Sequence, residues 1–372
     1  MKRIKKALVA TVTLLLVAAM LIGCASLGKP MMRLGDSELT ANMVSLFLSR
    51  LKGTLSLSTT GDVLWDTIVD NEKGTTYNDF YTAQGIEAAK TYLAAMHVFE
   101  ERGLRLPDSV VDSVDAGIDA LIDEEGSRAA LNEKLAEYGV NVKILREVYL
   151  IEEKLAYLMD DLYAEDGSLI AKNEKDDFYN EQYRRFKQIF LPLYEYVYET
   201  DSQGKLVKVR DDKGNYKIRE LNAEEELALN KKVETILEAA KTGDYTGFDE
   251  LVSKYDEEPD EASKLYPEGF YLSERSNYKI EEVRKALFSM DEGEIRAVIP
   301  DGGYGVYIIM RYENAESGYS AEANQAFFGD FTELLKNHLI GEYLDRFTKE
   351  ITVDEDVARG VDIKSVGANV YY

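Results

Sequence analysis

The fold is decided by two stretches, Arg185-Phe-Lys-Gln-Ile-Phe-Leu191 and Gly293-Glu-Ile-Arg-Ala-Val-Ile-Pro-Asp-Gly-Gly-Tyr-Gly-Val-Tyr-Ile-Ile-Met-Arg-Tyr312. Both are rich in β-branched and aromatic residues, which predicts strands. Asp301-Gly302-Gly303 has the composition of a turn, so the second stretch is expected to hold two strands joined there. Between the two stretches, the spacing of apolar residues predicts helices at Asn222–Lys241, Phe248–Tyr255 and Ile280–Met290. These elements predict an antiparallel sheet with flanking helices.

A further β element is expected directly after the first strand. Asp201-Ser-Gln-Gly204 and Asp211-Asp-Lys-Gly214 are turn signals, and they flank the apolar stretches Leu206–Val209 and Tyr216–Ile218. This pattern predicts an inserted β-hairpin at about residues 197–221.

The segments on either side of this region are helical in pattern. Thr40 is a predicted N-cap for a helix that reaches Gly53, and Trp65, in the loop that follows, is expected to pack on the helices. Further helices are predicted at residues 77–102, from Pro107 onward, at 127–138 and at 142–164. The last predicted helix, Ser320–Phe347, carries a broad apolar stripe that must be buried: Phe327, Phe328, Phe331, Leu334, Leu335, Leu339 and Leu344. The chain is therefore predicted to be α+β.

The N-terminus has the form of a bacterial lipoprotein signal. Met1–Lys6 is basic, Ala7–Met20 is almost entirely apolar, and Leu21-Ile22-Gly23-Cys24 has the form of a lipobox. A transmembrane anchor is the alternative, but this apolar run is shorter than the roughly 20 residues that span a bilayer. We therefore expect cleavage before Cys24, lipidation of its sulfur and attachment to the extracytoplasmic face of the cell membrane.

Composition excludes several classes of protein. Cys24 is the only cysteine, so once it is lipidated the chain has no disulfide, cysteine nucleophile or cysteine metal ligand. The formal net charge of −25 disfavours nucleic acid as a partner. The acidity favours solubility beside a membrane, or else attraction to basic secreted proteins. With 45% hydrophobic residues, the chain can form two domains with cores of their own.

The two strand stretches resemble the first and last strands of a parvulin-type peptidyl-prolyl isomerase domain. Elements elsewhere in the chain resemble PrsA-like and SurA-like foldases, in an order that covers nearly the whole mature chain: Leu34–Thr40, Gly103-Leu104 to Ser109, and Tyr179–Arg185. This resemblance implies a signal peptide at 1–23, a helical chaperone-like domain at 24–175, a parvulin-like domain at 176–316, and a C-terminal helix and tail at 317–372. In that family the C-terminal segment returns to complete the helical domain, and residues 351–372 are expected to form an edge segment there. The alternative is a self-associating helix.

The resemblance also gives the positions of an active site. The two histidines of the family fall on Gln188 and Tyr307, and the acidic or thiol position falls on Glu258. The residues that grip the prolyl ring fall on Lys279 and Val283, and a later aromatic position falls on Phe288. Because Lys279 places a charge where an apolar side chain is needed, and both histidines are replaced, we expect weak or absent isomerase activity.

The sequence thus favours a lipid-anchored extracytoplasmic foldase or chaperone that acts on unfolded or newly translocated polypeptides, without a cofactor or metal. The alternatives are an active peptidyl-prolyl isomerase and a non-enzymatic structural or solute-binding lipoprotein. The two histidines, His97 and His338, lie in predicted helices away from any serine or acid motif, which disfavours a hydrolase triad. An acidic loop at 256–261 matches no EF-hand spacing, so a solvated loop is favoured over a calcium site.

Overall fold

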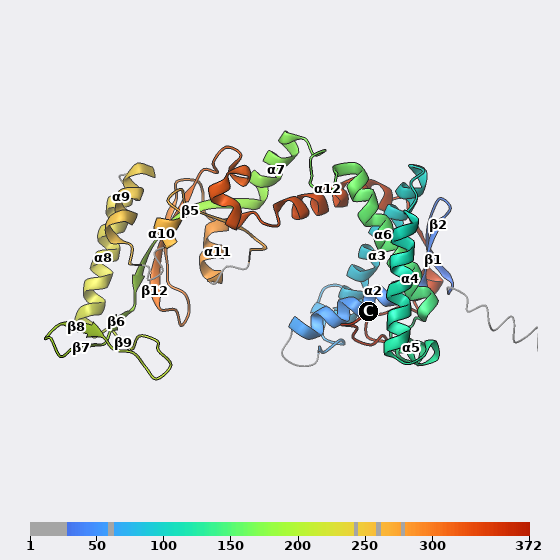
Figure 1. Ribbon diagram of the computed structural model, residues 1–372, viewed down its shortest axis with the longest axis horizontal. Coiled ribbons are helices and arrows are strands. Elements are labelled where there is room, and N and C mark those ends of the chain that lie inside the picture. Colours follow the sequence, from blue (N-terminus) through green and yellow to red (C-terminus); the bar gives the residue numbers. More distant parts are fainter. Residues whose placement is uncertain (1–27, 59–62, 242–244, 258–261, 277–279) are drawn as a thin grey trace, which may run out of the picture. The chain divides into compact units, whose positions relative to one another are not determined.

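The computed structural model describes residues 28–58, 63–241, 245–257, 262–276 and 280–372. The protein is mixed α and β, as predicted, and it divides into two compact units. Unit 1 comprises the described residues up to Leu169 together with Lys336–Tyr372, and unit 2 is Ile170–Leu335 (Figure 1). The predicted domain boundaries lie near 175 and 316. In the structure the second boundary lies between Leu335 and Lys336, inside the helix α12 (Phe331–Thr348).

Unit 1 opens with a small antiparallel sheet in the order β13-β1-β2. The hairpin of β1 (Pro30–Leu34) and β2 (Ser37–Thr40) contains most of the stretch Leu34–Thr40 on which the resemblance rests, and α2 (Ala41–Ser58) follows it directly. The third strand, β13 (Thr352–Val353), comes from the C-terminal tail and pairs Val353 with Met32. Of the predicted edge segment at 351–372, Thr352–Val353 therefore form a strand on β1.

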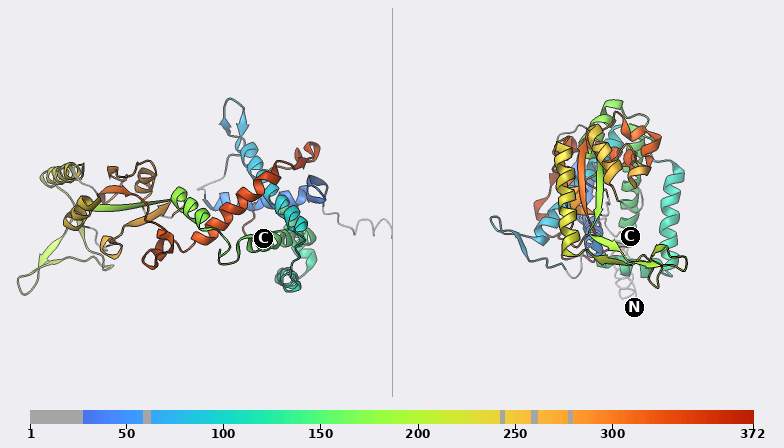
Figure 2. Two further views of the ribbon diagram at one scale, coloured as in Figure 1. Left: turned by 90° about the horizontal axis from the view of Figure 1, so that it is seen from above. Right: turned by 90° about the vertical axis from the view of Figure 1, so that its left-hand side faces the viewer.

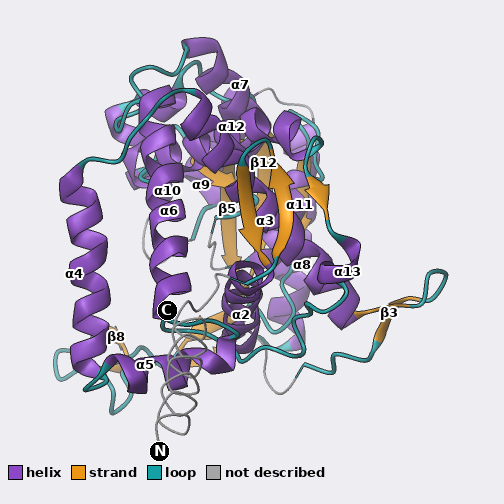
Figure 3. Cartoon of the chain, turned by 90° about the vertical axis from the view of Figure 1, so that its right-hand side faces the viewer, coloured by secondary structure: helices purple, strands orange, loops and turns teal. Residues whose placement is uncertain are grey.

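The helices of unit 1 pack around one apolar core (Figure 3). Thr76 caps α3 through a capping box with Asp79, and Asn141 caps α6 by accepting a hydrogen bond from the backbone N–H of Ile144. Trp65 packs against the core, as expected, with its ring 6.2 Å from that of Tyr81. The elements are α2 (Ala41–Ser58), β3 (Ile68–Asp70), β4 (Thr75–Thr76), α3 (Tyr77–Glu101), α4 (Asp108–Glu124), α5 (Arg128–Leu135), η1 (Ala136–Tyr138), α6 (Val142–Tyr163) and α13 (Glu355–Ala358).

The C-terminal helix begins later than predicted. Residues 318–327 form the short 3₁₀ turns η2 (Gly318–Ser320) and η3 (Glu322–Phe327), and α12 spans Phe331–Thr348. Gly329 and Asp330 lie directly before α12, and both residue types are poor in helix interiors. The prediction of one continuous helix over 320–347 was therefore wrong.

The apolar stripe of this segment is divided between the two units. Leu344 is buried in the core of unit 1, as predicted, together with Ile340, which was not part of the predicted stripe. Phe328 and Phe331 instead pack inside unit 2, where the ring centroid of Phe328 is 4.9 Å from that of Tyr183. The expectation that the whole stripe packs on the N-terminal helices was wrong. Tyr179 of α7 (Lys172–Gln182) and Tyr271 of the sheet provide aromatic partners for Phe328 instead.

The tail after α12 is part of unit 1. Val361, Ile363 and Val366 are buried in its core. The backbone N–H of Asn369 donates to the carbonyl of Ser49 on α2 at 2.9 Å. At Gly53 a Cβ would lie 2.0 Å from the carbonyl oxygen of Asn369, so only glycine allows the tail to approach α2 this closely.

Unit 2 is built on a four-stranded antiparallel sheet in the order β10-β5-β12-β11. Gln188 and Phe190 lie on one face with α11, whereas Ile189 and Leu191 lie on the other with α8 and α9 (Figure 1). The two stretches that decide the fold are thus the central strands β5 and β12. The elements are α7 (Lys172–Gln182), β5 (Tyr183–Pro192), α8 (Ala223–Lys241), α9 (Tyr245–Tyr255), α10 (Ala262–Leu265), β10 (Phe270–Ser273), α11 (Glu281–Phe288), β11 (Ile295–Val298) and β12 (Gly305–Tyr312).

The insertion after β5 consists of two short ribbons instead of the single predicted hairpin. β6 (Tyr194–Tyr196) pairs with β9 (Ile218–Glu220), and β7 (Tyr198–Thr200) pairs with β8 (Leu206–Lys208). Figure 2 shows these strands, in yellow-green, extending away from the sheet of unit 2. The turn at Asp201 closes the ribbon of β7 and β8, and the turn at Asp211 closes a separate pair between Arg210 and Tyr216. For this reason 206–209 and 216–218 do not form one regular hairpin.

A charged contact joins the base of the insertion to α8. Arg219 of β9 donates two hydrogen bonds of 2.7 Å to Glu225, which also accepts from the backbone N–H of Asn222. These bonds, that from Arg219 first, lower the pKa of Glu225 to about 2.

This shift predicts an acid-dependent loss of stability. Because the pKa in the folded protein lies below the unfolded value, the contact stabilises the fold above about pH 4 and is lost as the pH falls toward 2. We expect Glu225→Gln to lower the melting temperature at pH 6, and we expect this difference to disappear near pH 2. Glu226→Gln, at an exposed position of the same turn, is the control. A difference between wild type and Glu225→Gln that persists at pH 2 would contradict this assignment.

Candidate functional site

A mainly apolar groove in unit 1 has a volume of about 510 Å³. It lies among α3, α4, α6 and the segment that joins α3 to α4. Its lining is mainly aliphatic and aromatic, with charged residues at the rim. The lining residues are Glu38, Met43, Met96, Phe99, Glu100, Leu104, Arg105, Leu106, Val111, Glu147, Leu150, Ile151 and Lys154.

The end of α3 forms part of this groove through a Schellman turn. The backbone N–H of Leu104 donates to the carbonyl of Phe99, and that of Gly103 donates to the carbonyl of Glu100. Gly103 has φ +67°, a conformation that only glycine adopts readily. This turn brings Leu104 back toward Phe99. Leu106 then precedes Pro107, the N-cap residue of α4. The Gly103-Leu104 pair of the sequence is thus the element that places two apolar side chains in the groove.

The rim of the groove carries both signs of charge. Lys154 lies 3.2 Å from Glu100, and its ammonium is 5.6 Å from the centroid of the Phe99 ring. Glu100 also accepts a hydrogen bond of 3.0 Å from Ser37. The floor contains Met43 and Met96, whose unbranched side chains adapt to contacts of different shape. This arrangement can bind apolar side chains and has no set of polar groups directed at one reacting atom.

Two of the predicted site residues, Gln188 and Tyr307, lie on the same face of the sheet in unit 2. Gln188 pairs with Ile309 and Tyr307 pairs with Phe190, so Gln188 and Tyr307 are diagonal neighbours on strands β5 and β12. Gln188 is 1% exposed and Tyr307 is 8% exposed. The Tyr307 ring packs against that of Phe190 at 5.0 Å between centroids.

Of the other predicted site residues, the structure describes Val283 and Phe288. Val283 is fully buried in the core beneath this face, and Phe288 is half-buried, with the guanidinium of Arg184 5.2 Å from its ring centroid. Glu258 and Lys279 lie outside the described residues. Gln188 lines a cavity of about 360 Å³, which it shares with Tyr266, Pro267 and Phe270.

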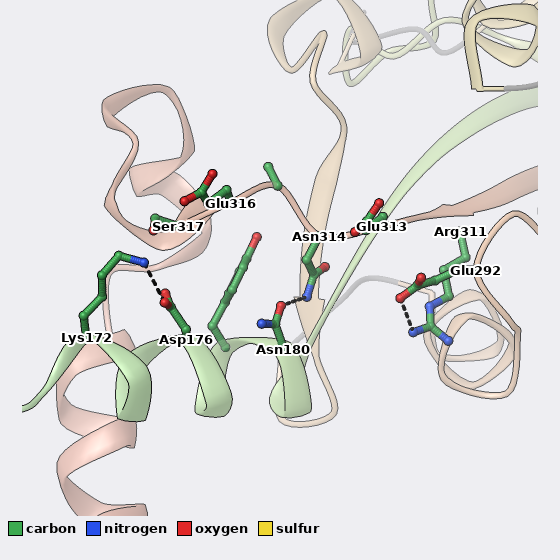
Figure 4. Close-up of a pocket in the computed structure, with 11 residues that line it drawn as sticks. Lys172, Asp176, Asn180, Glu292, Arg311, Glu313, Asn314, Glu316 and Ser317 are labelled. Atoms are coloured by element: carbon green, nitrogen blue, oxygen red, sulfur yellow. Dashed lines mark hydrogen bonds and ion pairs between the residues drawn. The ribbon is translucent and has the colours of Figure 1, made fainter.

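A second, polar pocket of unit 2 lies between α7 and the segment after β12 (Figure 4). Four of its charged side chains form two ion pairs: Lys172 with Asp176 at 2.6 Å, and Arg311 with Glu292 at 3.4 Å. The hydrogen bond from Lys172 is the main reason that the pKa of Asp176 is lowered. We interpret the pocket as a structural network built on these two ion pairs.

The two histidines each lie close to a glutamate on their own helix. His97 of α3 lies 3.4 Å from Glu101, and His338 of α12 lies 3.5 Å from Glu342, both one helical turn away. Within the described part of the chain, no three His, Cys, Asp or Glu side chains are grouped as metal ligands. Most of the acidic loop at 256–261 is outside that part. In the part that is described, the carboxylate of Asp256 accepts a hydrogen bond from the backbone N–H of Phe190, and the backbone N–H of Glu257 donates to the carbonyl of Phe190.

Cys24, the predicted lipidation site, also lies outside the described residues. Among the residues that the structure does describe, no helix is both long and apolar enough to cross a membrane.

The groove residues were not predicted as a site from the sequence. Met96 and Phe99 have helical spacing, and this spacing predicts only that they face a core. One feature of the sequence does point to the groove. Leu104-Arg-Leu106 places two apolar residues in a short connection between helices, where polar residues are more common.

No protein-family model and no curated protein matches the chain. Among solved structures, it is similar to foldase protein PrsA from Streptococcus pneumoniae, with 16% identity over 76% of this chain and 92% of that one, at a TM-score of 0.23. It is similar to the PrsA foldase of Lactococcus lactis, with 11% identity over 88% and 96% of the two chains and a TM-score of 0.23. PrsA from Bacillus subtilis matches with 16% identity over 80% and 90%, at a TM-score of 0.20.

Proposed function

We propose that the protein is an extracytoplasmic foldase of the chaperone type, which binds unfolded or newly translocated polypeptides in the apolar groove of unit 1. The observation that carries this proposal is the groove itself, which is open and lined by Met, Phe, Leu and Ile side chains. Exposed apolar surface of this kind marks a site of interaction. An unfolded polypeptide presents the apolar side chains that fit it.

The composition of the groove favours varied polypeptides over one small molecule. A small-molecule site usually places a few polar groups at fixed positions within an apolar pocket. Here two of the charged lining residues, Lys154 and Glu100, bind each other. Flexible methionines on the floor suit a protein that accepts many sequences.

The sheet of unit 2 supports a weak or absent isomerase activity. Prolyl isomerisation requires an apolar, ordered site that holds the twisted amide, against a rotation barrier of about 18–20 kcal/mol. Val283 at a ring-gripping position is buried in the core, so it is not accessible to a prolyl ring. Gln188 and Tyr307 are both buried and are best explained as structural residues of the sheet. An efficient peptidyl-prolyl isomerase is the second candidate function, favoured only by the cavity that Gln188 lines.

Two assays on the soluble form that begins after Cys24 test this proposal together. We expect suppression of the aggregation of a denatured client at stoichiometric concentrations. In a protease-coupled assay we expect little acceleration of a prolyl peptide, because Val283 is fully buried and Gln188 and Tyr307 stand where a parvulin has histidines. Failure to suppress aggregation would contradict the chaperone proposal. Acceleration equal to that of a histidine-bearing parvulin would establish the second candidate instead.

We also propose that Cys24 anchors the protein to the membrane. Its place at the end of a lipobox after a basic and an apolar segment supports this. We expect Cys24→Ala to abolish labelling by a radioactive fatty acid, and to leave either an uncleaved precursor or a protein released from the membrane fraction. Fatty-acid labelling that persists in the variant would contradict the anchor.

A further inference from the structure

The insertion in unit 2 presents an aromatic and aliphatic face. Tyr198 pairs with Lys208 and Tyr196 pairs with Ile218, and side chains alternate between the two faces of each ribbon. The residues on one face of the two ribbons therefore include Tyr194, Tyr196, Tyr198, Leu206, Tyr216 and Ile218, which we call the tyrosine face. Ring contacts connect its members, with 5.7 Å between the centroids of Tyr196 and Tyr216.

Much of the tyrosine face is accessible. Leu206 is 65% exposed, Tyr198 48%, Tyr216 44% and Ile218 42%. Tyr304, in the turn between β11 and β12, is 69% exposed and extends the face through its ring contact with Tyr194 at 6.4 Å. Contiguous exposed apolar residues on a small β element usually mark a contact with another chain.

Cations accompany the rings on this face. The ammonium of Lys208 lies 3.5 Å from the centroid of the Tyr196 ring, and the guanidinium of Arg210 lies 3.9 Å from that of Tyr216. By the same alternation, Glu195 and Glu199 belong to the opposite face. Apolar side chains and positive charge therefore occur together on the tyrosine face, whose one carboxylate, Glu220, is at its base.

The charge of the insertion differs from that of the rest of the chain. Residues 194–220 carry six Lys or Arg and six Asp or Glu, whereas the whole chain has a net charge of −25. Two of these carboxylates, Asp201 and Asp211, accept hydrogen bonds from backbone N–H groups in the turns. The tyrosine face is thus an electropositive apolar patch on an acidic protein.

We propose that the tyrosine face binds acidic polypeptide segments in which Asp or Glu adjoins aromatic or aliphatic residues. Charge complementarity favours this partner, because carboxylates of the segment can pair with Lys208 and Arg210. Its apolar side chains can pack on Tyr198, Leu206 and Ile218. A chain with this excess of negative charge repels acidic polypeptides elsewhere on its surface. The insertion thereby extends the range of proteins that can be bound beyond those the groove of unit 1 accepts.

Two labelled peptides test the proposal by fluorescence anisotropy on the soluble form. Both contain the same Leu and Phe residues, which are flanked by Glu in one peptide and by Lys in the other. We expect Lys208→Glu with Arg210→Glu to weaken binding of the Glu peptide by about tenfold or more, because attraction becomes repulsion. We expect the same change to leave binding of the Lys peptide equal or tighter. Glu195→Gln with Glu199→Gln, on the opposite face, is the matched control and is expected to have little effect.

A second variant tests the apolar part of the face. We expect Leu206→Ser with Ile218→Ser to weaken binding of the Glu peptide severalfold, with an unchanged circular dichroism spectrum. Glu-peptide binding that survives both the charge and the apolar variants, or that is lost equally in the opposite-face control, would overturn the proposal. So would a concentration-dependent dimer that Leu206→Ser with Ile218→Ser abolishes, since the face would then bind a second copy of the chain.

Discussion

Removal of residues 336–372 is expected to unfold unit 1. This segment contributes five side chains that are buried in its core: Ile340, Leu344, Val361, Ile363 and Val366. Each buried apolar side chain contributes about 1.5–3 kcal/mol, so their loss approaches or exceeds the 5–15 kcal/mol by which a typical domain is stable. The truncation also removes β13, the strand that pairs with β1.

Circular dichroism with thermal melting measures this effect. We expect the truncated chain to lose the helical signal of unit 1, while the sheet of unit 2 keeps its near-ultraviolet aromatic signal. The graded counterpart is Leu344→Ala, which removes a fully buried side chain and is expected to cost about 2–5 kcal/mol. Asp345→Ala, the exposed neighbour, is the control. A truncated chain that retains the full helical signal and melting temperature would show that the tail is dispensable for unit 1.

The second large effect concerns the groove. Leu106→Glu with Leu150→Glu is expected to abolish most of the suppression of client aggregation, because two carboxylates replace apolar side chains in the lining. Burying a carboxylate against an apolar segment of the client is costly, since the charge loses its water without gaining a partner. Both leucines are only half-buried, so the melting temperature is expected to change by a few degrees at most.

Leu57→Glu is the matched control, because Leu57 is 78% exposed on α2 and does not line the groove. The same chemical change at this position is expected to leave suppression intact. Equal loss of suppression in the Leu57 variant would mean that added negative charge, and not the groove, explains the result.

Much of the fold follows from local signals in the sequence. The predicted helices at 77–102, 142–164 and Asn222–Lys241 lie within one residue of α3, α6 and α8, where Thr76, Asn141 and Asn222 accept hydrogen bonds at the helix starts. The pairing of β ribbons in the insertion could not be predicted in this way. Two similar Asp-x-x-Gly turns allow more than one pairing, and only the contacts made by the folded ribbons decide between them.

The division of the last apolar stripe was also beyond local reasoning. A stripe on a predicted helix shows that its residues are buried, but it does not identify the residues that cover them. Phe328 and Phe331 pack with Tyr183, which precedes them by more than a hundred positions in the chain. The groove was missed for the same reason, because Phe99, Leu106 and Leu150 come from three separate segments.

The most direct test of the account is a cross-linking measurement at the groove. The soluble form that begins after Cys24 contains no cysteine, so a single introduced cysteine can carry a photoactivated cross-linker at a chosen position. We expect Leu150→Cys and Met96→Cys, in the groove, to cross-link to a denatured client in high yield, and we expect Leu57→Cys to cross-link weakly. Yields at the two groove positions that are no higher than at Leu57 would contradict the proposal that clients bind in the groove of unit 1.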